Sequence, residues 1–225
     1  MERFTLSRRL VAEGLGTALL VATVVGSGIM ATRLTNDIAL QLLCNAVATG
    51  AILVVLISIL GPLSGAHFNP VVSLVSGLGR ALPWREVPPY VAVQVAGGVM
   101  GVMAAHLMFD LPLVTFSTKL RTGWPQWFSE FVATFGLLAT ILCGMRFQKA
   151  AIPWLVGLYI TAAYWFTAST SFANPAVAFA RALTNTFSGI APADLIGFCL
   201  AQLAGAFAGW ALCAWLLKAE TARQS

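Results

Sequence analysis

Apolar residues occur along this chain in long continuous runs rather than in alternation with polar ones. A membrane-spanning helix needs about 20 mostly apolar residues, and six runs reach that length: about 10–32, 38–60, 88–109, 127–145, 151–169 and 193–217. Two further apolar pieces, about 69–78 and 175–185, are too short to span. Continuous runs favour helices over barrel strands. The pattern predicts an all-α integral membrane protein with six transmembrane helices and two short segments.

Composition supports the bilayer as the solvent of this chain. Hydrophobic residues make up 59% of the 225 residues and charged residues only 9%, and the mean hydropathy is +0.85. A soluble domain carries roughly a quarter charged residues. We therefore treat residues 1–225 as a single membrane domain. The four cysteines lie in or beside apolar runs without metal-like spacing, so we expect packing residues and no metal site or cofactor.

The net charge of +5 comes from the loops, which argues against nucleic-acid binding. With an even number of spans, both termini lie on the same side of the membrane as the second and fourth loops. This side carries nine of the 13 basic residues: Arg3, Arg8, Arg9, Arg80, Arg85, Arg146, Lys149, Lys218 and Arg223. The other side has Arg33, Lys119, Arg121 and Arg181. The bias predicts that both termini are cytoplasmic.

The chain contains an internal repeat, about 1–110 and about 124–225. Each half begins with an apolar helix that carries a glutamate, Glu13 or Glu130, and later reaches an Asn-Pro pair that opens a short apolar segment. Each half has three full spans, so the second half must enter the membrane from the opposite side. The two short segments are then re-entrant half-helices that approach each other from opposite faces.

The Asn-Pro boxes are Asn69-Pro70-Val71 and Asn174-Pro175-Ala176. Asparagine is a favoured N-cap and proline suits the first helical turn, so each half-helix is expected to begin at its box, near the membrane midplane. The positive ends of the two helices would face one point and form a barrier to cations, including protons, while the asparagine amides offer donors to a passing solute.

These features together resemble the major intrinsic proteins, the family of aquaporins and aquaglyceroporins. The resemblance is carried by the motifs AEGLGT, SGAHFNPVVSL, YVAVQVAGG, SEFVATFG and FANPA, which cover nearly the whole chain. It implies six tilted helices and two half-helices around one pore in each subunit of a homotetramer, with no enzymatic activity. In this family the two glutamates support the pore loops, a role that the resemblance assigns to Glu13 and Glu130, since an ionisable residue inside a span is a functional candidate. His67 matches a position whose backbone carbonyl faces the solute, although its ring has an equally good structural interpretation.

The chain departs from the family directly after the second box. The family usually has an arginine there, whereas this chain has Val177, and Val71 replaces the usual alanine of the first box. Valine is short, apolar and offers no hydrogen-bond donor, so the outer constriction is expected to be wide. Counting along the chain gives the remaining members of this constriction as Thr49, Ser171 and either Tyr164 or Ala162.

Arg181 lies four residues after Val177, on the same face of the short helix and one turn further out. One hypothesis places it in an outer vestibule, where it attracts anionic or strongly polar solutes. The alternative is a surface arginine paired with lipid or with a loop carboxylate.

The sequence therefore predicts a passive channel for water and small uncharged solutes, such as glycerol-like polyols, urea and neutral metalloid hydroxides. Val177 also resembles the arsenic-operon branch of bacterial aquaglyceroporins, which implies arsenite, with methylated arsenicals as further candidates, and a bacterial inner membrane. The alternatives are a secondary transporter, which also uses inverted repeats and broken helices, a plain water channel, and a closed structural protein.

Overall fold

The computed structural model describes residues 4–218, which form α-helices and 3-10 turns without a β-strand. The helices of the first half are α1 (Leu6–Leu34), α2 (Ile38–Ser64), α3 (Pro70–Leu78) and α4 (Val87–Met108). Those of the second half are α5 (Trp124–Phe147), α6 (Ile152–Phe166), α7 (Pro175–Arg181) and α8 (Leu195–Leu216). The 3-10 turns η1 (Trp84–Glu86), η2 (Lys149–Ala151) and η3 (Pro192–Asp194) precede α4, α6 and α8. Arg3 and Arg223 of the charge count lie outside the described residues.

Five of the described helices, α1, α2, α4, α5 and α8, are long and apolar enough to cross a membrane. The fifth predicted span, about 151–169, is shorter than expected, because α6 has 15 residues and ends at Phe166. At Thr167 the backbone becomes extended, with φ −113° and ψ 135°. The chain from Thr167 to Ala173 is then a loop that leads into α7, so the expected six-helix order is kept with one short member.

The burial pattern is that of a protein in lipid. The outer surface exposes large apolar side chains, among them Val11, Ile38, Ile59, Leu107, Leu158 and Ile196. The interior contains polar side chains with no exposed surface, including Glu13, Gln94, Glu130 and Gln202. Buried polar groups need hydrogen-bond partners, so the specific contacts of this fold are concentrated in its centre.

In each half, the first and last helices cross at close distance, and a glycine lies at the crossing point. α4 crosses α1 at Gly97, where a Cβ atom would lie 2.2 Å from the carbonyl oxygen of Gly14. α8 crosses α5 at Gly205, where a Cβ atom would lie 2.3 Å from the carbonyl oxygen of Phe131. Small residues allow membrane helices to approach at backbone distance. In each half, a glycine therefore allows close packing between the helix that carries the glutamate and the last helix of that half.

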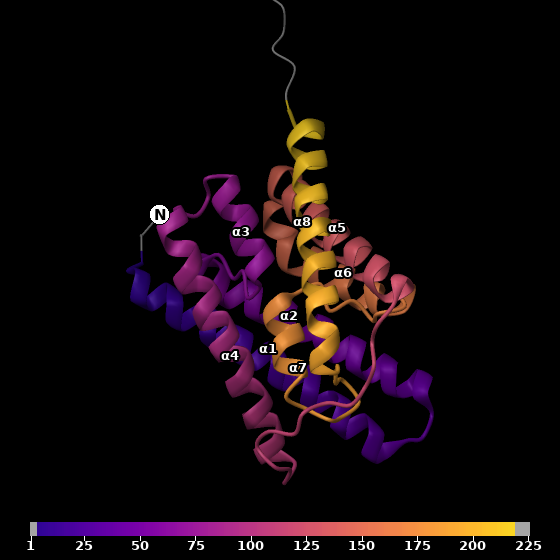
Figure 1. Ribbon diagram of the computed structural model, residues 1–225. Helices are drawn as coiled ribbons and strands as arrows, with labels where there is room; N and C mark the ends of the chain where they lie inside the picture. The colour runs from indigo at the N-terminus through magenta and orange to yellow at the C-terminus, as the bar shows by residue number, and fades with distance from the viewer. Residues whose placement is uncertain (1–3, 219–225) are drawn as a thin grey trace, which may run out of the picture.

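The two short helices enter the centre from opposite sides (Figure 1), α3 from the upper side of the view and α7 from the lower. Both are shorter than a span, with nine residues in α3 and seven in α7. α7 ends at Arg181, before the predicted limit of about 185, because the following residues pair with the loop after α4. The carbonyl groups of Ala182 and Leu183 accept hydrogen bonds from the N–H groups of Ser117 and Thr115.

Candidate solute pathway

The two short helices meet at their asparagine caps. Asn69 accepts the N–H of Val71 at 3.1 Å, and Asn174 accepts the N–H of Ala176 at 3.0 Å. Pro70 and Pro175 occupy the first turn of their helices. The sequence-expected arrangement of cap, proline and half-helix is therefore present at both boxes.

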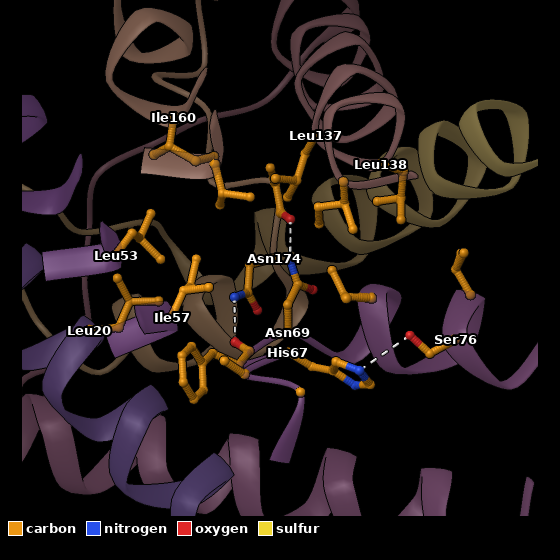
Figure 2. A pocket seen from close by; sticks show the side chains of 18 of the residues that line it. Leu20, Leu53, Ile57, His67, Asn69, Ser76, Leu137, Leu138, Ile160 and Asn174 are labelled. Carbon is orange, nitrogen blue, oxygen red and sulfur yellow. Dashed lines mark hydrogen bonds between the residues drawn. The ribbon is translucent and has the colours of Figure 1, made fainter. Parts of the chain in front are cut away.

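Each asparagine also reaches across to the other half of the chain (Figure 2). The side-chain amide of Asn69 donates to the carbonyl of Ala173 at 2.7 Å, and that of Asn174 donates to the carbonyl of Phe68 at 2.8 Å. An amide nitrogen carries two hydrogens, and only one bond of each is used within residues 4–218. Both asparagines line the central cavity, so each has a donor available to a solute.

The loops that precede the two caps have an unusual backbone. Ala66 and Phe68 before α3 both have φ of 49°, and Ser171 and Ala173 before α7 have φ of 50° and 48°. A non-glycine residue with positive φ costs on the order of 1–3 kcal/mol, so the surrounding structure must impose this conformation. The result is a set of carbonyl groups that accept no hydrogen bond within the described chain and whose residues line the cavity: Gly65, Ala66, His67, Ser171 and Phe172.

Glu13 of α1 imposes the conformation of the first loop. One carboxylate oxygen accepts the hydroxyl of Ser64 at 2.7 Å and the N–H of His67 at 2.9 Å. The other accepts the N–H of Phe68 at 2.7 Å and the side-chain amide of Gln94 at 2.9 Å. The carboxylate is fully buried and does not line the cavity. It turns the N–H groups of the loop away from the pathway, which leaves the carbonyl side available.

Glu130 of α5 does the same for the second loop. Its oxygens accept the N–H groups of Phe172 and Ala173, both at 2.9 Å. The side-chain amide of Gln202 donates to it at 2.6 Å. Gln94 and Gln202 were not singled out from the sequence. The signal was the repeat itself, because each lies on the closing helix of its half and donates to the glutamate of the opening helix.

One cavity of about 470 Å³ runs past both loops and both asparagines. Its apolar wall is shown in Figure 2 and is formed by side chains of α1, α2, α5 and α6: Leu20, Leu53, Ile57, Leu137, Leu138 and Ile160. The cavity reaches Arg9 and Leu82 at one end and Arg181 at the other. The opposite wall carries the loop carbonyls and the asparagine amides. The lining is therefore amphipathic along the whole path.

The residues expected at the outer constriction come together in this cavity. Thr49, Tyr164, Ser171 and Val177 all line it, and the hydroxyl oxygens of Thr49 and Tyr164 are 3.1 Å apart. Ala162, the alternative to Tyr164, is exposed on the outside of α6. Of the two candidates, Tyr164 therefore lines the cavity and Ala162 does not.

The third residues of the two boxes and His67 differ in their position relative to the cavity. Val71 and Ala176 are buried against the protein and do not line the cavity. His67 does line it, and one ring nitrogen is 3.0 Å from the hydroxyl of Ser73. The other is 3.3 Å from the hydroxyl of Ser76 (Figure 2). The ring therefore packs against α3, while the backbone of the same residue contributes to the pathway.

Arg181 is not a surface residue. Its exposure is 2%, its side chain lines the cavity, and no carboxylate forms an ion pair with it among residues 4–218. The alternative of an arginine paired with lipid or with a loop carboxylate is therefore wrong. Arg9, which the sequence did not single out as a pore residue, lines the opposite end and pairs with Glu86 at 2.7 Å.

Comparisons with known proteins agree with this fold. The profile of the family described as Major intrinsic protein matches residues 1–151. The chain is 66% identical to Aquaglyceroporin AqpS of Rhizobium meliloti (strain 1021) over 218 residues, which cover 97% of this chain and 94% of the relative. It is 32% identical to Aquaporin NIP1-1 of Arabidopsis thaliana over 68% of this chain and 54% of the relative. The crystal structure of the aquaglyceroporin from Plasmodium falciparum superposes with a TM-score of 0.73 at 20% identity and covers 95% of this chain and 96% of its own.

Proposed function

This chain belongs to the major intrinsic protein family and is a membrane channel protein, and we propose that it passively conducts water and small uncharged solutes. The solutes are glycerol-like polyols, urea and neutral metalloid hydroxides such as arsenite, with methylated arsenicals as an extension of the same class. The observation that carries the proposal is the amphipathic cavity that passes both asparagine caps. A polyol can place its hydroxyl groups on the carbonyl wall and its carbon chain on the apolar wall.

The outer constriction favours solutes larger than water. Val177 and Thr49 are small, and the hydroxyl of Tyr164 is held near that of Thr49, on the wall of the cavity. Pore diameter and the donors that line it set selectivity in channels of this kind. The similarity to a protein named an aquaglyceroporin supports the same choice over a plain water channel.

Cation exclusion is the second element of the proposal. The N-termini of α3 and α7 face the centre, and a helix N-terminus carries roughly half a positive charge. No aspartate or glutamate lines the cavity within the described chain. A cation or a proton would therefore meet positive potential without a compensating carboxylate.

A secondary transporter would need a titratable group exposed to the pathway for coupling. Glu13 and Glu130 are the buried carboxylates at the pore loops, and both are held by backbone N–H groups away from the cavity. A channel fits this arrangement better, and its solute flux should need no ion gradient.

The surface of the protein and its relatives bear on its membrane, its oligomeric state and its orientation. Exposed apolar side chains cover the long helices and suit lipid or a neighbouring subunit. We propose a homotetramer in the inner (plasma) membrane of a bacterium, with both termini in the cytoplasm, as the basic loops indicate. Neither a cofactor nor a catalytic reaction is needed for this function.

The test is stopped-flow light scattering on purified protein in liposomes, with water, glycerol, urea and arsenite as solutes. The wild-type protein should accelerate glycerol and arsenite entry above empty liposomes without an ion gradient. Val177→Arg should lower glycerol permeability relative to water by about tenfold, the effect of roughly 1.4 kcal/mol on a barrier. Val177→Met, which adds length without donors, separates bulk from hydrogen bonding. An unchanged solute profile in Val177→Arg would show that Val177 does not set selectivity.

A further inference from the structure

Two of the four cysteines face each other between α5 and α8. The sulfur atoms of Cys143 and Cys213 lie 4.0 Å apart, although the two residues stand 70 positions apart in the chain. Cys143 is half-buried and Cys213 is buried. The sequence gives no reason to pair these two residues, and it treats all four cysteines as packing residues. The fold brings two of them together as a dithiol.

The close packing of α5 against α8 is what joins the two thiols (Figure 1). At Gly209 of α8, an added Cβ atom would lie 2.8 Å from the carbonyl oxygen of Phe135 on α5. Cys213 stands four residues after Gly209, and therefore on the same face of α8. Cys143 stands eight residues after Phe135, about two turns further along α5. Both cysteines thus continue the contact that the glycine makes possible.

The dithiol lies outside the solute pathway. Neither cysteine lines the cavity, whereas Leu142 and Trp210 do. Cys143 stands four residues before the end of α5, and Cys213 stands three residues before the end of α8. At a rise of 1.5 Å per residue, each thiol lies within about 6 Å of the end of its helix. A ligand can therefore reach the half-buried Cys143 from the surface at the helix ends without entering the pore.

The separation of the two sulfur atoms suits one bridging atom. A disulfide needs the sulfurs about 2.05 Å apart, so the side chains would have to approach each other by about 2 Å. A bridging atom that forms a bond of about 2.3 Å to each sulfur, as zinc does with thiolates, reaches sulfurs up to about 4.6 Å apart. The observed 4.0 Å lies within this reach.

The surroundings restrict the bridging atom to one that needs only two thiolates. No group of three or more His, Cys, Asp or Glu side chains that could hold a metal ion is found among residues 4–218, whereas a structural Zn²⁺ ion takes four ligands. A net charge in an apolar environment is costly, so two thiolates require a centre with a formal charge of two. Arsenic(III) that carries one organic substituent meets both conditions, because carbon occupies its third position.

We propose that Cys143 and Cys213 form a dithiol site that binds monosubstituted arsenic(III) compounds, R–As(OH)₂. Two As–O bonds break and two As–S bonds form, each thiol proton leaves with a hydroxyl group as water, and arsenic remains trivalent. Cys143 reacts first, since it is the more exposed thiol. Cys213 then closes the ring from 4.0 Å away, with the advantage of an intramolecular step. The site is separate from the pathway, so it does not depend on the proposed channel function.

The experiment measures equilibrium binding of radiolabelled phenylarsine oxide, which hydrates to the dihydroxide, to the purified full-length protein in detergent. The wild-type protein should bind one molecule per chain. A dithiol such as 2,3-dimercaptopropanol should displace it, and 2-mercaptoethanol at the same thiol concentration should not. Cys143→Ser and Cys213→Ser should each weaken binding by about 100-fold, because the remaining thiol binds without the gain from two linked contacts.

Cys199→Ser is the matched control, because it removes a thiol from the same helix as Cys213 and should keep the wild-type affinity. A second measurement needs no substitution. Phenylarsine oxide should block the alkylation of Cys143 by N-ethylmaleimide in the wild-type protein and leave that of the exposed Cys44 unchanged. The proposal is overturned if the wild-type protein does not bind the probe, if either Cys143→Ser or Cys213→Ser binds it as tightly as wild type, or if Cys199→Ser loses as much affinity. Unchanged alkylation of Cys143 in the presence of the probe would overturn it as well.

Discussion

The two halves of the chain hold their pore loops with the same groups but surround them with different side chains. In the first half, Glu13 receives the loop N–H groups and the amide of Gln94. In the second half, Glu130 receives the equivalent N–H groups and the amide of Gln202. The shared parts fix the backbone, because both loops must expose their carbonyl groups.

The halves differ at the residues that stand two before and seven after each asparagine. In the first half these are His67 and Ser76, which form a neutral pair at 3.3 Å. In the second half they are Phe172 and Arg181, which form a cation–π stack at 3.3 Å. The comparison teaches that the duplicated scaffold tolerates a change from neutral to charged at an equivalent position. The charge of a side chain beside the pathway can therefore change while the backbone of the pore loop stays the same.

The largest expected effect comes from neutralising the glutamates. Glu13→Gln should lower the free energy of unfolding by more than about 3 kcal/mol, because charge-assisted hydrogen bonds contribute about 1.5–3 kcal/mol each. Glu130→Gln should cost less, since Glu130 accepts three hydrogen bonds where Glu13 accepts four. Thermal melting in detergent, with glycerol permeability of the surviving protein, measures both. A larger loss in Glu130→Gln would break the ranking of the two halves.

A smaller and equal effect is expected at the helix crossings. Gly97→Ala and Gly205→Ala place a methyl group about as close to a backbone oxygen, at 2.2 Å and 2.3 Å, so each should cost about 1–3 kcal/mol of stability. Gly26→Ala is the control, because its nearest neighbour would be a side-chain atom of Phe109 at 3.4 Å. The melting temperature of each variant in detergent reports the result. If Gly97→Ala and Gly205→Ala differed widely, the two crossings would not be equivalent supports.

The smallest effect is expected from making the first half resemble the second. Ser73 bonds the ring of His67 at 3.0 Å and the amide of Gln94 at 2.9 Å, whereas the equivalent position in α7 is Ala178. Ser73→Ala should cost about 1 kcal/mol, the usual contribution of a hydrogen bond. Ser58→Ala is the control, since its exposed hydroxyl bonds only its own helix. Melting curves again provide the measurement, and a loss as large as that of Glu13→Gln would make Ser73 a principal support.

Much of this arrangement could be predicted from the sequence. The order of the helices, the two capped half-helices and the two buried glutamates follow from apolar run lengths and from the repeat. The repeat marks Gln94 and Gln202 as equivalent positions on the closing helices, but it does not give their partners, because a glutamine on an apolar helix has many possible partners. Their role depends on which helix faces which, and the glycines at the crossings determine that facing.

The constriction was less accessible to sequence reasoning. Tyr164 and Ala162 could not be separated by counting, because the length of the turn between α6 and α7 sets which side chain faces inward. The burial of Arg181 could not be predicted either. A charged residue at the end of a short helix reads as an outer-mouth residue, and the Phe172 ring beneath it comes from the preceding loop. The loop and the helix are neighbours in the chain, but the angle between them, which brings the ring to the guanidinium, is set only when the chain has folded.

The reciprocal bonds from Asn69 to Ala173 and from Asn174 to Phe68 have a consequence for how this protein is made. During synthesis the first half leaves the ribosome before the second. The amide of Asn69 then lacks its acceptor until residue 173 has been added, inserted and turned inward. Neither half can complete its own pore loop, so the last step of assembly is the docking of two inserted halves. A complete pathway past both asparagine caps is therefore expected only after that step.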